Sequence, residues 1–219
     1  MHKNEMLAHR YNSSGELIVT ELRQGVKNPE RVNVFVSGKF EFSLDVAQVV
    51  DLGVRVGTVL SSEELGELKR ASEFGKLYQR ALEKALSRPH SERELRDYLN
   101  RKVFEKKLDK KYIDEIIGRL IDRGYLNDRR FAEWYVENRF VKKGVSRRRL
   151  NMELSKKGVA KEIIDETLST SERDDAGEIL KIITRKRARY DDEKLLAYLC
   201  RQGFSFDLSR ELIQSYGKD

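Results

Sequence analysis

Alternating apolar and polar residues near the start of the chain predict a small β element. Residues 31–36 place three valines on one face of an extended segment, and residues 40–44 repeat this period of two with two phenylalanines and a leucine. The loop between them, residues 37–39, contains a glycine, and two alternating runs joined in this way are typical of a β-hairpin. We also expect a third strand over residues 17–23 and a short helix over residues 45–52.

From residue 60 onward the apolar spacing changes to that of helices, and one motif recurs three times. In each copy a polar residue that suits a helix cap is followed by leucines four and eight positions later. The three copies are Ser91, Leu95 and Leu99; Ser146, Leu150 and Leu154; and Asp191, Leu195 and Leu199. Each copy lies between further helical segments, so the repeated unit is helix–turn–helix–turn–helix.

This repeat predicts the fold class. Small three-helix units bury little core of their own, and they are stabilised by stacking on their neighbours. We therefore expect a mainly α protein with three tandem three-helix, helix-turn-helix-like repeats in an elongated curved array, preceded by a small N-terminal β-hairpin or sheet. The predicted domains are residues 1–72 for the hairpin and short helices, then 73–127, 128–171 and 172–219 for the three repeats.

Cap residues predict where several helices begin. Ser61 and Ser91 are each followed three positions later by glutamate, which is the pattern of a capping box. We expect Asp128 to cap the first helix of the second repeat. The helix that starts after Ser61 is expected to break near Gly75, because glycine is a weak helix former.

Composition limits the class of protein. Charged residues make up 37% of the 219 residues, against about 25% in an average globular protein, which suits several small cores rather than one thick core. The longest apolar run is six residues, far below the roughly 20 of a membrane helix, and the first residues lack the apolar segment of a secretory signal. One cysteine and three scattered histidines form neither a disulfide nor a metal site. We expect a cytoplasmic monomer without catalytic residues, metal or cofactor.

Positive charge is concentrated in one short stretch. Lysine and arginine exceed the acidic residues by 44 to 37, a net charge of +7, yet residues 139–161 alone hold nine basic residues and a single acid, Glu153. On a helical wheel over residues 146–157, the side opposite the two leucines holds Arg148, Arg149, Met152, Ser155 and Lys156. A cationic face almost without acids favours a phosphate backbone or an acidic groove over an ordinary solvated face, which mixes both signs.

The predicted binding residues are Lys142, Lys143, Arg147, Arg148, Arg149, Lys156, Lys157 and Lys161. A second basic cluster follows a later helix, and it either extends this surface or complements the C-terminal dipole of its own helix. Its members are Arg185, Lys186, Arg187 and Arg189. We expect that reversing the charge of Arg147 and Arg149 would abolish binding and leave the helical content intact.

Three segments resemble the RecX family of RecA regulators. They are residues 88–99 (RPHSERELRDYL), 120–132 (LIDRGYLNDRRFA) and 143–158 (KGVSRRRLNMELSKKG), in the order and at distances that fit the family. Residues 38–42 and 57–65 look like the N-terminal region of longer members, and the third repeat matches more loosely. The resemblance implies three tandem three-helix repeats whose middle repeat contacts its partner through the basic residues above.

The same resemblance implies a regulator that does no chemistry of its own. Such a protein binds the RecA–single-stranded DNA filament and inhibits its extension and its ATPase, strand-exchange and co-protease activities, which modulates recombination and the SOS response. Single-stranded or double-stranded DNA would be an auxiliary partner, and no membrane would be involved. Binding along the groove of the filament and capping of its end both remain open.

Two other functions remain open on the residues alone. An autonomous helix-turn-helix protein would read duplex DNA through one repeat, usually as a symmetric dimer. An enzyme would need catalytic carboxylates, because no phosphate-binding loop, nucleophile motif or histidine-centred triad is present in the sequence. The helical spacing of Phe131, Trp134 and Tyr135 favours core packing over a platform on which bases stack.

Overall fold

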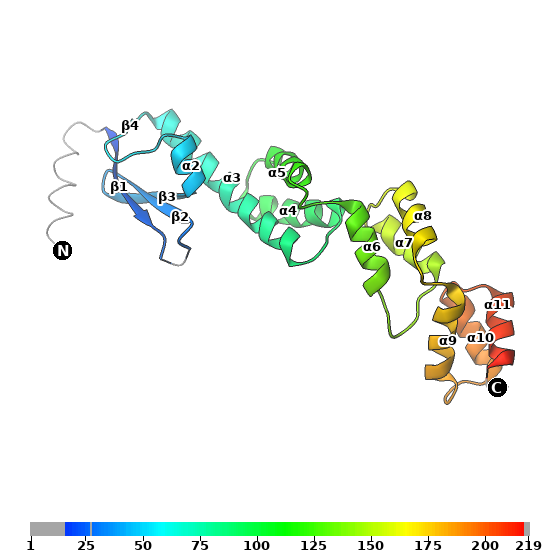
Figure 1. Ribbon diagram of the computed structural model, residues 1–219. Coiled ribbons are helices and arrows are strands. Elements are labelled where there is room, and N and C mark those ends of the chain that lie inside the picture. Colours follow the sequence, from blue (N-terminus) through cyan, green and yellow to red (C-terminus); the bar gives the residue numbers. More distant parts are fainter. Residues whose placement is uncertain (1–15, 27, 217–219) are drawn as a thin grey trace. The chain divides into compact units, whose positions relative to one another are not determined.

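The computed structural model describes residues 16–216 with the exception of residue 27 (Figure 1). Most of the described chain is helical and follows a small antiparallel sheet. The chain divides into two compact units. The first contains the sheet and is made of two segments, the chain up to Leu82 and Lys102–Tyr112. The second unit comprises Glu83–Arg101 and the chain from Ile113 onward.

The sheet of the first unit contains the predicted hairpin. Its strands are β1 (Leu17–Gln24), β2 (Arg31–Val36), β3 (Lys39–Asp45) and the two-residue β4 (Val59–Leu60), in the order β3-β2-β1-β4. Val36 pairs with Lys39, so the hairpin loop is two residues long, one shorter than the sequence suggests. Both loop residues, Ser37 and Gly38, have positive φ, as tight hairpin turns between twisted strands require.

The core of the first unit lies between one face of the sheet and the segments that follow it. Its buried side chains come from all four strands, from Val54 and from Leu68 of α3 (Ser62–Ser87). Between β3 and β4 lies α2 (Val46–Asp51), which corresponds to the predicted short helix and is capped by Asp45 in a capping box.

The long helix α3 begins as predicted but does not break. The Ser61 hydroxyl accepts from the amide of Glu64 at 3.1 Å, and the Glu64 carboxylate accepts from the amide of Ser61 at 2.7 Å, so this capping box is confirmed. The expected break at Gly75 is wrong. A Cβ atom at Gly75 would lie 2.5 Å from Oε1 of Gln48, so the glycine is needed for close packing of α2 against α3.

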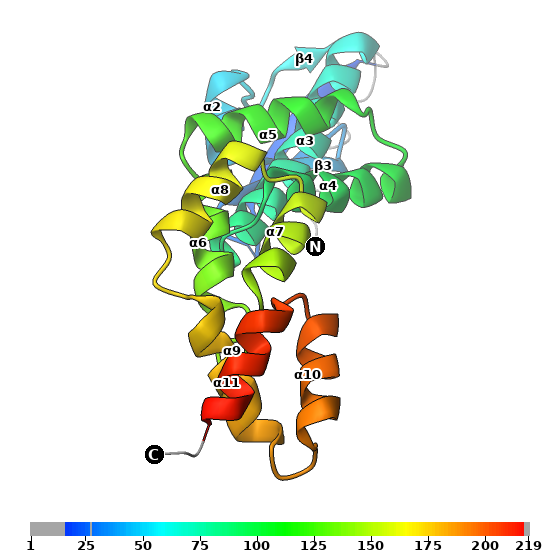
Figure 2. The same cartoon turned by 90° about the vertical axis from the view of Figure 1, so that its right-hand side faces the viewer.

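The remaining helices carry the repeat. They are α4 (Glu92–Lys106), α5 (Lys111–Asp122), α6 (Asp128–Asn138), α7 (Arg147–Lys156), α8 (Lys161–Thr170), α9 (Asp175–Lys186), α10 (Asp192–Arg201) and α11 (Phe206–Ser215). The six leucines of the motif lie in α4, α7 and α10, and each is at most 1% exposed. The tandem three-helix architecture is therefore confirmed, with separate cores inside α6–α8 and α9–α11; Figure 2 shows α9, α10 and α11 side by side.

The helix starts of the second unit need one correction and one refinement. Asn127, not Asp128, caps α6, since its side chain accepts from the amide of Arg130 at 3.0 Å. Asp128 is the first helical residue, and its carboxylate accepts from the amide of Glu92 at the start of α4. Ser91 caps α4, because its hydroxyl accepts from the amide of Glu94. The Glu94 carboxylate does not complete the capping box; it pairs with Lys157, the C-cap residue of α7.

Candidate functional site

Helix α7 holds the centre of the basic stretch in place. The Ser146 hydroxyl accepts from the amide of Arg149 at 3.2 Å and so caps the helix. Leu150 and Leu154 are buried, which turns the opposite face, with Arg148 and Lys156, to solvent. Met152 is 52% exposed on the same face, as the helical wheel predicts.

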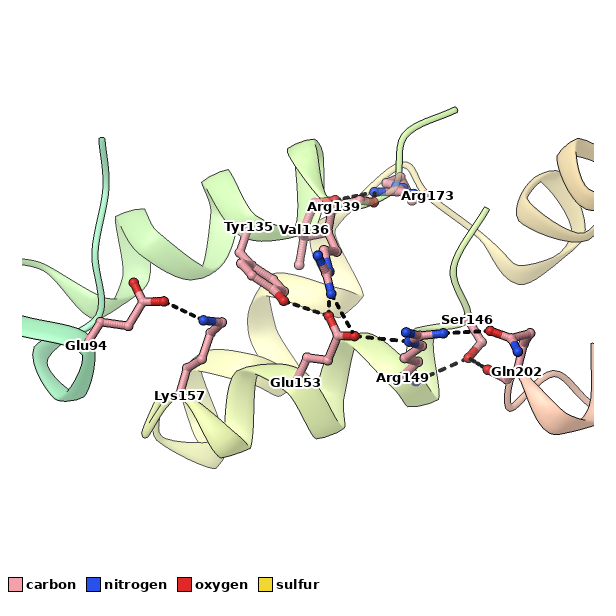
Figure 3. Close-up of polar contacts among 10 residues, drawn as sticks. All are labelled: Glu94, Tyr135, Val136, Arg139, Ser146, Arg149, Glu153, Lys157, Arg173 and Gln202. Carbon is pink, nitrogen blue, oxygen red and sulfur yellow. Dashed lines mark hydrogen bonds and ion pairs between the residues drawn. The ribbon is translucent and has the colours of Figure 1, made fainter. Parts of the chain in front are cut away.

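Glu153, the single acid of the stretch, forms ion pairs with two arginines. Its carboxylate accepts from Nε of Arg139 at 2.7 Å and from Nε of Arg149 at 3.0 Å, and it also accepts from the Tyr135 hydroxyl at 2.6 Å (Figure 3). Burial acts to raise the pKa of Glu153, but the hydrogen bonds from Arg139, Tyr135 and Arg149 outweigh it and lower that pKa to about 2. Burial and the bond to Glu153 raise the pKa of Tyr135 to about 12.

Arg149 also joins the second repeat to the third. Its Nη1 donates to Oε1 of Gln202, which follows α10, at 2.6 Å, and the Ser146 hydroxyl donates to the Gln202 carbonyl at 2.7 Å (Figure 3). Gly203, with φ of +93°, lies so close to Ser146 that a Cβ atom would approach its hydroxyl to 2.9 Å. Arg149 is therefore held within the protein by Glu153 and Gln202.

Lys157 makes the corresponding contact between the first and second repeats. Its ammonium group pairs with the Glu94 carboxylate of α4, which also accepts from Arg88 at 3.2 Å. The Arg88 guanidinium lies 5.1 Å from the centre of the Trp134 ring, a cation–π distance. A Cβ atom at Gly158 would lie 2.9 Å from that of Arg93, so this junction is as close as the one at Gly203.

Arg147 also has a structural role. Its Nε donates to the Arg173 carbonyl at 3.1 Å, and its Nη2 donates to the Ser171 carbonyl at 3.3 Å, both in the connection between α8 and α9. Charge reversal at Arg147 and Arg149 would break these contacts and those with Gln202. The pair that the sequence favours for mutation is therefore an unsuitable test of binding.

Five of the eight predicted binding residues have charged groups that no other residue of the described chain pairs with. Within the described part of the chain, their side chains are exposed and form no ion pair or hydrogen bond. They are Lys142, Lys143, Arg148, Lys156 and Lys161. The basic stretch thus consists of a framework of four held residues, Arg139, Arg147, Arg149 and Lys157, and the five unpaired cations.

Two adjoining hollows, of about 450 and 580 Å³, run beside α7 and share Glu153 and Lys156. Together we call them the basic depression. Seven basic residues line it against the two acids Glu94 and Glu153. The basic residues are Arg88, Arg139, Arg148, Arg149, Lys156, Lys157 and Arg201.

Three of these basic residues are absent from the sequence prediction. Alignment of the repeats could have identified two of them. Arg201 lies two positions after Leu199, as Lys156 lies two positions after Leu154. Arg88 lies three positions before the cap residue Ser91, as Lys143 lies three positions before Ser146. Arg139 lies within the basic stretch, but the sequence gives no sign that it shares Glu153 with Arg149.

The aromatic residues of α6 divide between core and surface. Phe131 and Tyr135 are buried in the core of the second repeat, which confirms the prediction for them. Trp134 is half-buried and forms part of the wall of the basic depression beside Arg88.

Part of the second basic cluster is also held in place. The Lys186 ammonium lies 4.5 and 4.3 Å from the ring centres of Tyr190 and Tyr198, and Arg187 pairs with Asp192 at 3.0 Å. Arg185 and Arg189 are exposed.

The third helix of each repeat carries an acidic exposed surface. In α8, one basic and three acidic residues are exposed; in α11, one basic and two acidic; and in α5, two basic and three acidic. In a helix-turn-helix protein the helix after the short turn enters the major groove, where acidic residues meet the phosphates unfavourably. Positive charge here belongs instead to α7, the middle helix.

The described residues include no group of three or more His, Cys, Asp or Glu side chains that is arranged to hold a metal ion. Within the same part of the chain, no helix has the length and apolar character needed to span a bilayer.

These features define a class of protein: tandem three-helix units that present a cationic, partly preorganised surface. A family model described as "RecX, second three-helix domain" matches residues 127–168. Curated relatives named "Regulatory protein RecX" include one from Bacillus velezensis, 31% identical over 87% of this chain and 74% of the relative, and one from Listeria monocytogenes, 30% identical over 88% and 73%.

Solved structures agree with the fold. A "Crystal structure of regulatory protein RecX" aligns with a TM-score of 0.67 at 20% identity, and the alignment covers 90% of this chain and 98% of that one. RecX from Lactobacillus salivarius aligns with a TM-score of 0.52 at 26% identity over 66% and 96%. The chain belongs to the RecX family, and it is a regulatory protein of that family.

Proposed function

We propose that this protein binds the RecA–single-stranded DNA filament through the basic depression beside α7 and inhibits filament extension and the associated ATPase, strand-exchange and co-protease activities. The observation that carries the proposal is the pair Arg148 and Lys156: both are exposed on α7 and their side chains have no partner in the described chain. Cations without internal partners are free to replace the counterions of a polyanion, and the release of those counterions favours binding.

The paired residues support this proposal in a different way. Because Glu153 and Glu94 fix Arg139, Arg149, Arg88 and Lys157, the walls of the depression are ordered before any partner arrives. Less side-chain entropy is then lost on binding, which favours affinity. Lys142, Lys143 and Lys161 extend the proposed surface at the two ends of α7, and Arg185 and Arg189 form a secondary one.

The alternative, autonomous reading of duplex DNA, fits the charge distribution less well. The acidic exposed surfaces of α5, α8 and α11 lie on the helices that such a protein would insert into the major groove. We further propose that the protein acts in the cytoplasm as a monomer, without catalysis of its own, and that its modules have the limits 1–72, 73–127, 128–171 and 172–219.

The decisive experiment is a titration of RecA ATPase on single-stranded DNA with the wild-type protein and with the double variant Arg148→Ala, Lys156→Ala. The variant should need roughly tenfold more protein for half-inhibition, because two contacts of about 0.7 kcal/mol each are lost. A matched control, Arg101→Ala with Lys110→Ala, also removes one exposed arginine and one exposed lysine and should inhibit like wild type.

Two results would overturn the proposal. One is unchanged inhibition by the Arg148, Lys156 variant when its circular dichroism and urea unfolding match those of wild type. The other is tight, sequence-selective binding of duplex DNA without RecA in gel-shift assays, which would favour the helix-turn-helix alternative.

A further inference from the structure

A second hollow of the second unit differs in character from the basic depression. It has a volume of about 460 Å³ and lies where the C-terminal ends of α6 and α8 meet the start of α9. Three glutamates line it, Glu133 and Glu137 of α6 and Glu172 after α8, and within the described chain no ion pair or hydrogen bond holds their side chains. We call it the acidic pocket.

One residue of the pocket lining, Thr167, has a buried hydroxyl without a partner. Thr167 of α8 is only 5% exposed, and its Oγ1 is the one buried side-chain oxygen or nitrogen of the described residues that has no hydrogen-bond partner. Thr167 is also among the residues that line the hollow. An unpaired buried hydroxyl is unfavourable by about 1–3 kcal/mol, so a donor that enters the pocket would remove this loss.

The C-terminal ends of α6 and α8, which border the pocket, already attract guanidinium groups. The C-terminus of a helix carries a partial negative charge, which a basic residue in the last turn usually offsets. Neither α6 nor α8 has a basic residue in its last turn. Guanidinium groups from outside the two helices offset this charge: Arg173 donates to the carbonyls of Val136 and Arg139 at the end of α6, and Arg147 donates to the Ser171 carbonyl at the end of α8.

Two cations, Arg173 and Lys181, also line the pocket, but both are held by ion pairs with Glu178. Arg173 pairs with Glu178 at 2.8 Å and donates to the carbonyls of Val136 and Arg139, and Lys181 pairs with Glu178 at 2.7 Å (Figure 3 shows Arg173 beside Val136 and Arg139). Both are held on the α9 side by one buried carboxylate. Arg173 also demonstrates that the carbonyls at the end of α6 accept a guanidinium.

We propose that the acidic pocket binds an arginine side chain presented by a partner protein. The guanidinium would donate to the carboxylates of Glu133 and Glu137 and to the Thr167 hydroxyl. The methylene groups of the arginine would lie against Val141, which is 47% exposed at the rim. Arginine fits better than lysine, because its planar group offers several donors at fixed angles to acceptors on two helices.

The test is a titration of the isotopically labelled, full-length protein with N-acetylarginine amide, followed by two-dimensional NMR. Saturable shifts should cluster in residues 133–141 and 167–173, with a dissociation constant of the order of 1 mM, as expected for so small a ligand. N-acetylcitrulline amide, which has the same shape without the charge, should give no saturable shifts. Shifts of equal size with both probes, or shifts scattered over all acidic surfaces, would overturn the proposal.

Two variants separate binding from a structural role. Glu133→Gln with Glu137→Gln should weaken arginine binding about fivefold or more, whereas Glu162→Gln with Asp165→Asn, which removes two exposed carboxylates of α8 outside the pocket, should not. Thr167→Val should weaken binding about threefold even though it raises stability, since it removes the unpaired hydroxyl. Unchanged affinity in the Glu133, Glu137 variant or in Thr167→Val would contradict the assignment. No RecA is present, so this result is independent of the proposed function.

Discussion

The carboxylate of Asp175 accepts a hydrogen bond from the backbone amide of Arg147 at 2.8 Å, and this bond joins the first residue of α9 to the start of α7. Asp128, the first residue of α6, makes the same bond at 2.8 Å with the amide of Glu92 at the start of α4. The first amides of a helix have no partner within the helix. At both junctions, therefore, the following repeat supplies the acceptor that the middle helix of the preceding repeat lacks.

This relationship predicts the effect of Asp175→Ala. The substitution leaves the Arg147 amide without its acceptor in a half-buried junction, and we expect the free energy of unfolding to fall by about 1–2 kcal/mol in urea denaturation. Asp165→Ala, on the exposed face of α8, is the control and should change stability by less than about 0.5 kcal/mol. Equal effects of the two substitutions would mean that the bond contributes nothing to the junction.

Two glycines that follow helices, Gly124 after α5 and Gly203 after α10, predict a graded loss of stability. Gly124 and Gly203 both have positive φ, but a Cβ atom at Gly124 meets nothing within 4 Å, whereas at Gly203 it meets the Ser146 hydroxyl. Gly124→Ala should lose only about 1 kcal/mol to backbone strain. Gly203→Ala should lose about 2–4 kcal/mol, because Ser146 must also move away from Gln202. Thermal unfolding of both variants measures the difference, and a Gly203 variant as stable as the Gly124 variant would contradict the close junction.

The pKa of Glu153 predicts how stability depends on acid. Its folded-state value of about 2 lies below the ordinary value of 4.5, so its contribution is complete above about pH 4.5 and is lost as the pH falls toward 2. The contribution is of the order of 2 kcal/mol once partial solvent exposure is allowed for. Glu153→Gln should lower stability at pH 7 and flatten the loss between pH 4.5 and 2. An unchanged acid dependence, measured by urea unfolding at a series of pH values, would refute the network's role.

Trp134, the only tryptophan of the chain, reports on the basic depression whose wall it forms. Addition of an oligothymidylate should change its fluorescence in a saturable way, and salt should reverse the change. Arg148→Ala with Lys156→Ala should reduce the slope of log affinity against log salt by about 1.4, that is about 0.7 for each lost phosphate contact with a single strand. A slope equal to that of wild type would show that neither residue contacts phosphate.

The sequence predicts the parts of the fold that depend on local spacing. The motif leucines of α7, the hairpin and the caps at Ser61 and Ser146 follow from periodicity and from chemistry within a few residues. The break expected at Gly75 was wrong because the reason for that glycine, Gln48, lies on another helix.

The candidate site was harder to predict, because its pairings span long separations. Lys157 and Glu94 are 63 positions apart, and Arg149 and Gln202 are 53 apart, so counting charges along the chain cannot separate paired from free cations. Glu153 appears in the sequence merely as a minor exception to a positive run. In the structure it pairs with Arg139 and Arg149 and so places them in the framework, whereas cations such as Arg148 and Lys156 stay unpaired.

The junction bonds at Glu92 and Arg147 have one further consequence. Both bonds use the backbone amide, so the side chain at that position does not take part in them, and the two repeats carry opposite charges there. These two bonds are thus independent of the charge of the residue that donates them. Exposed residues outside the paired framework can therefore change from acidic to basic while these two junction bonds are retained.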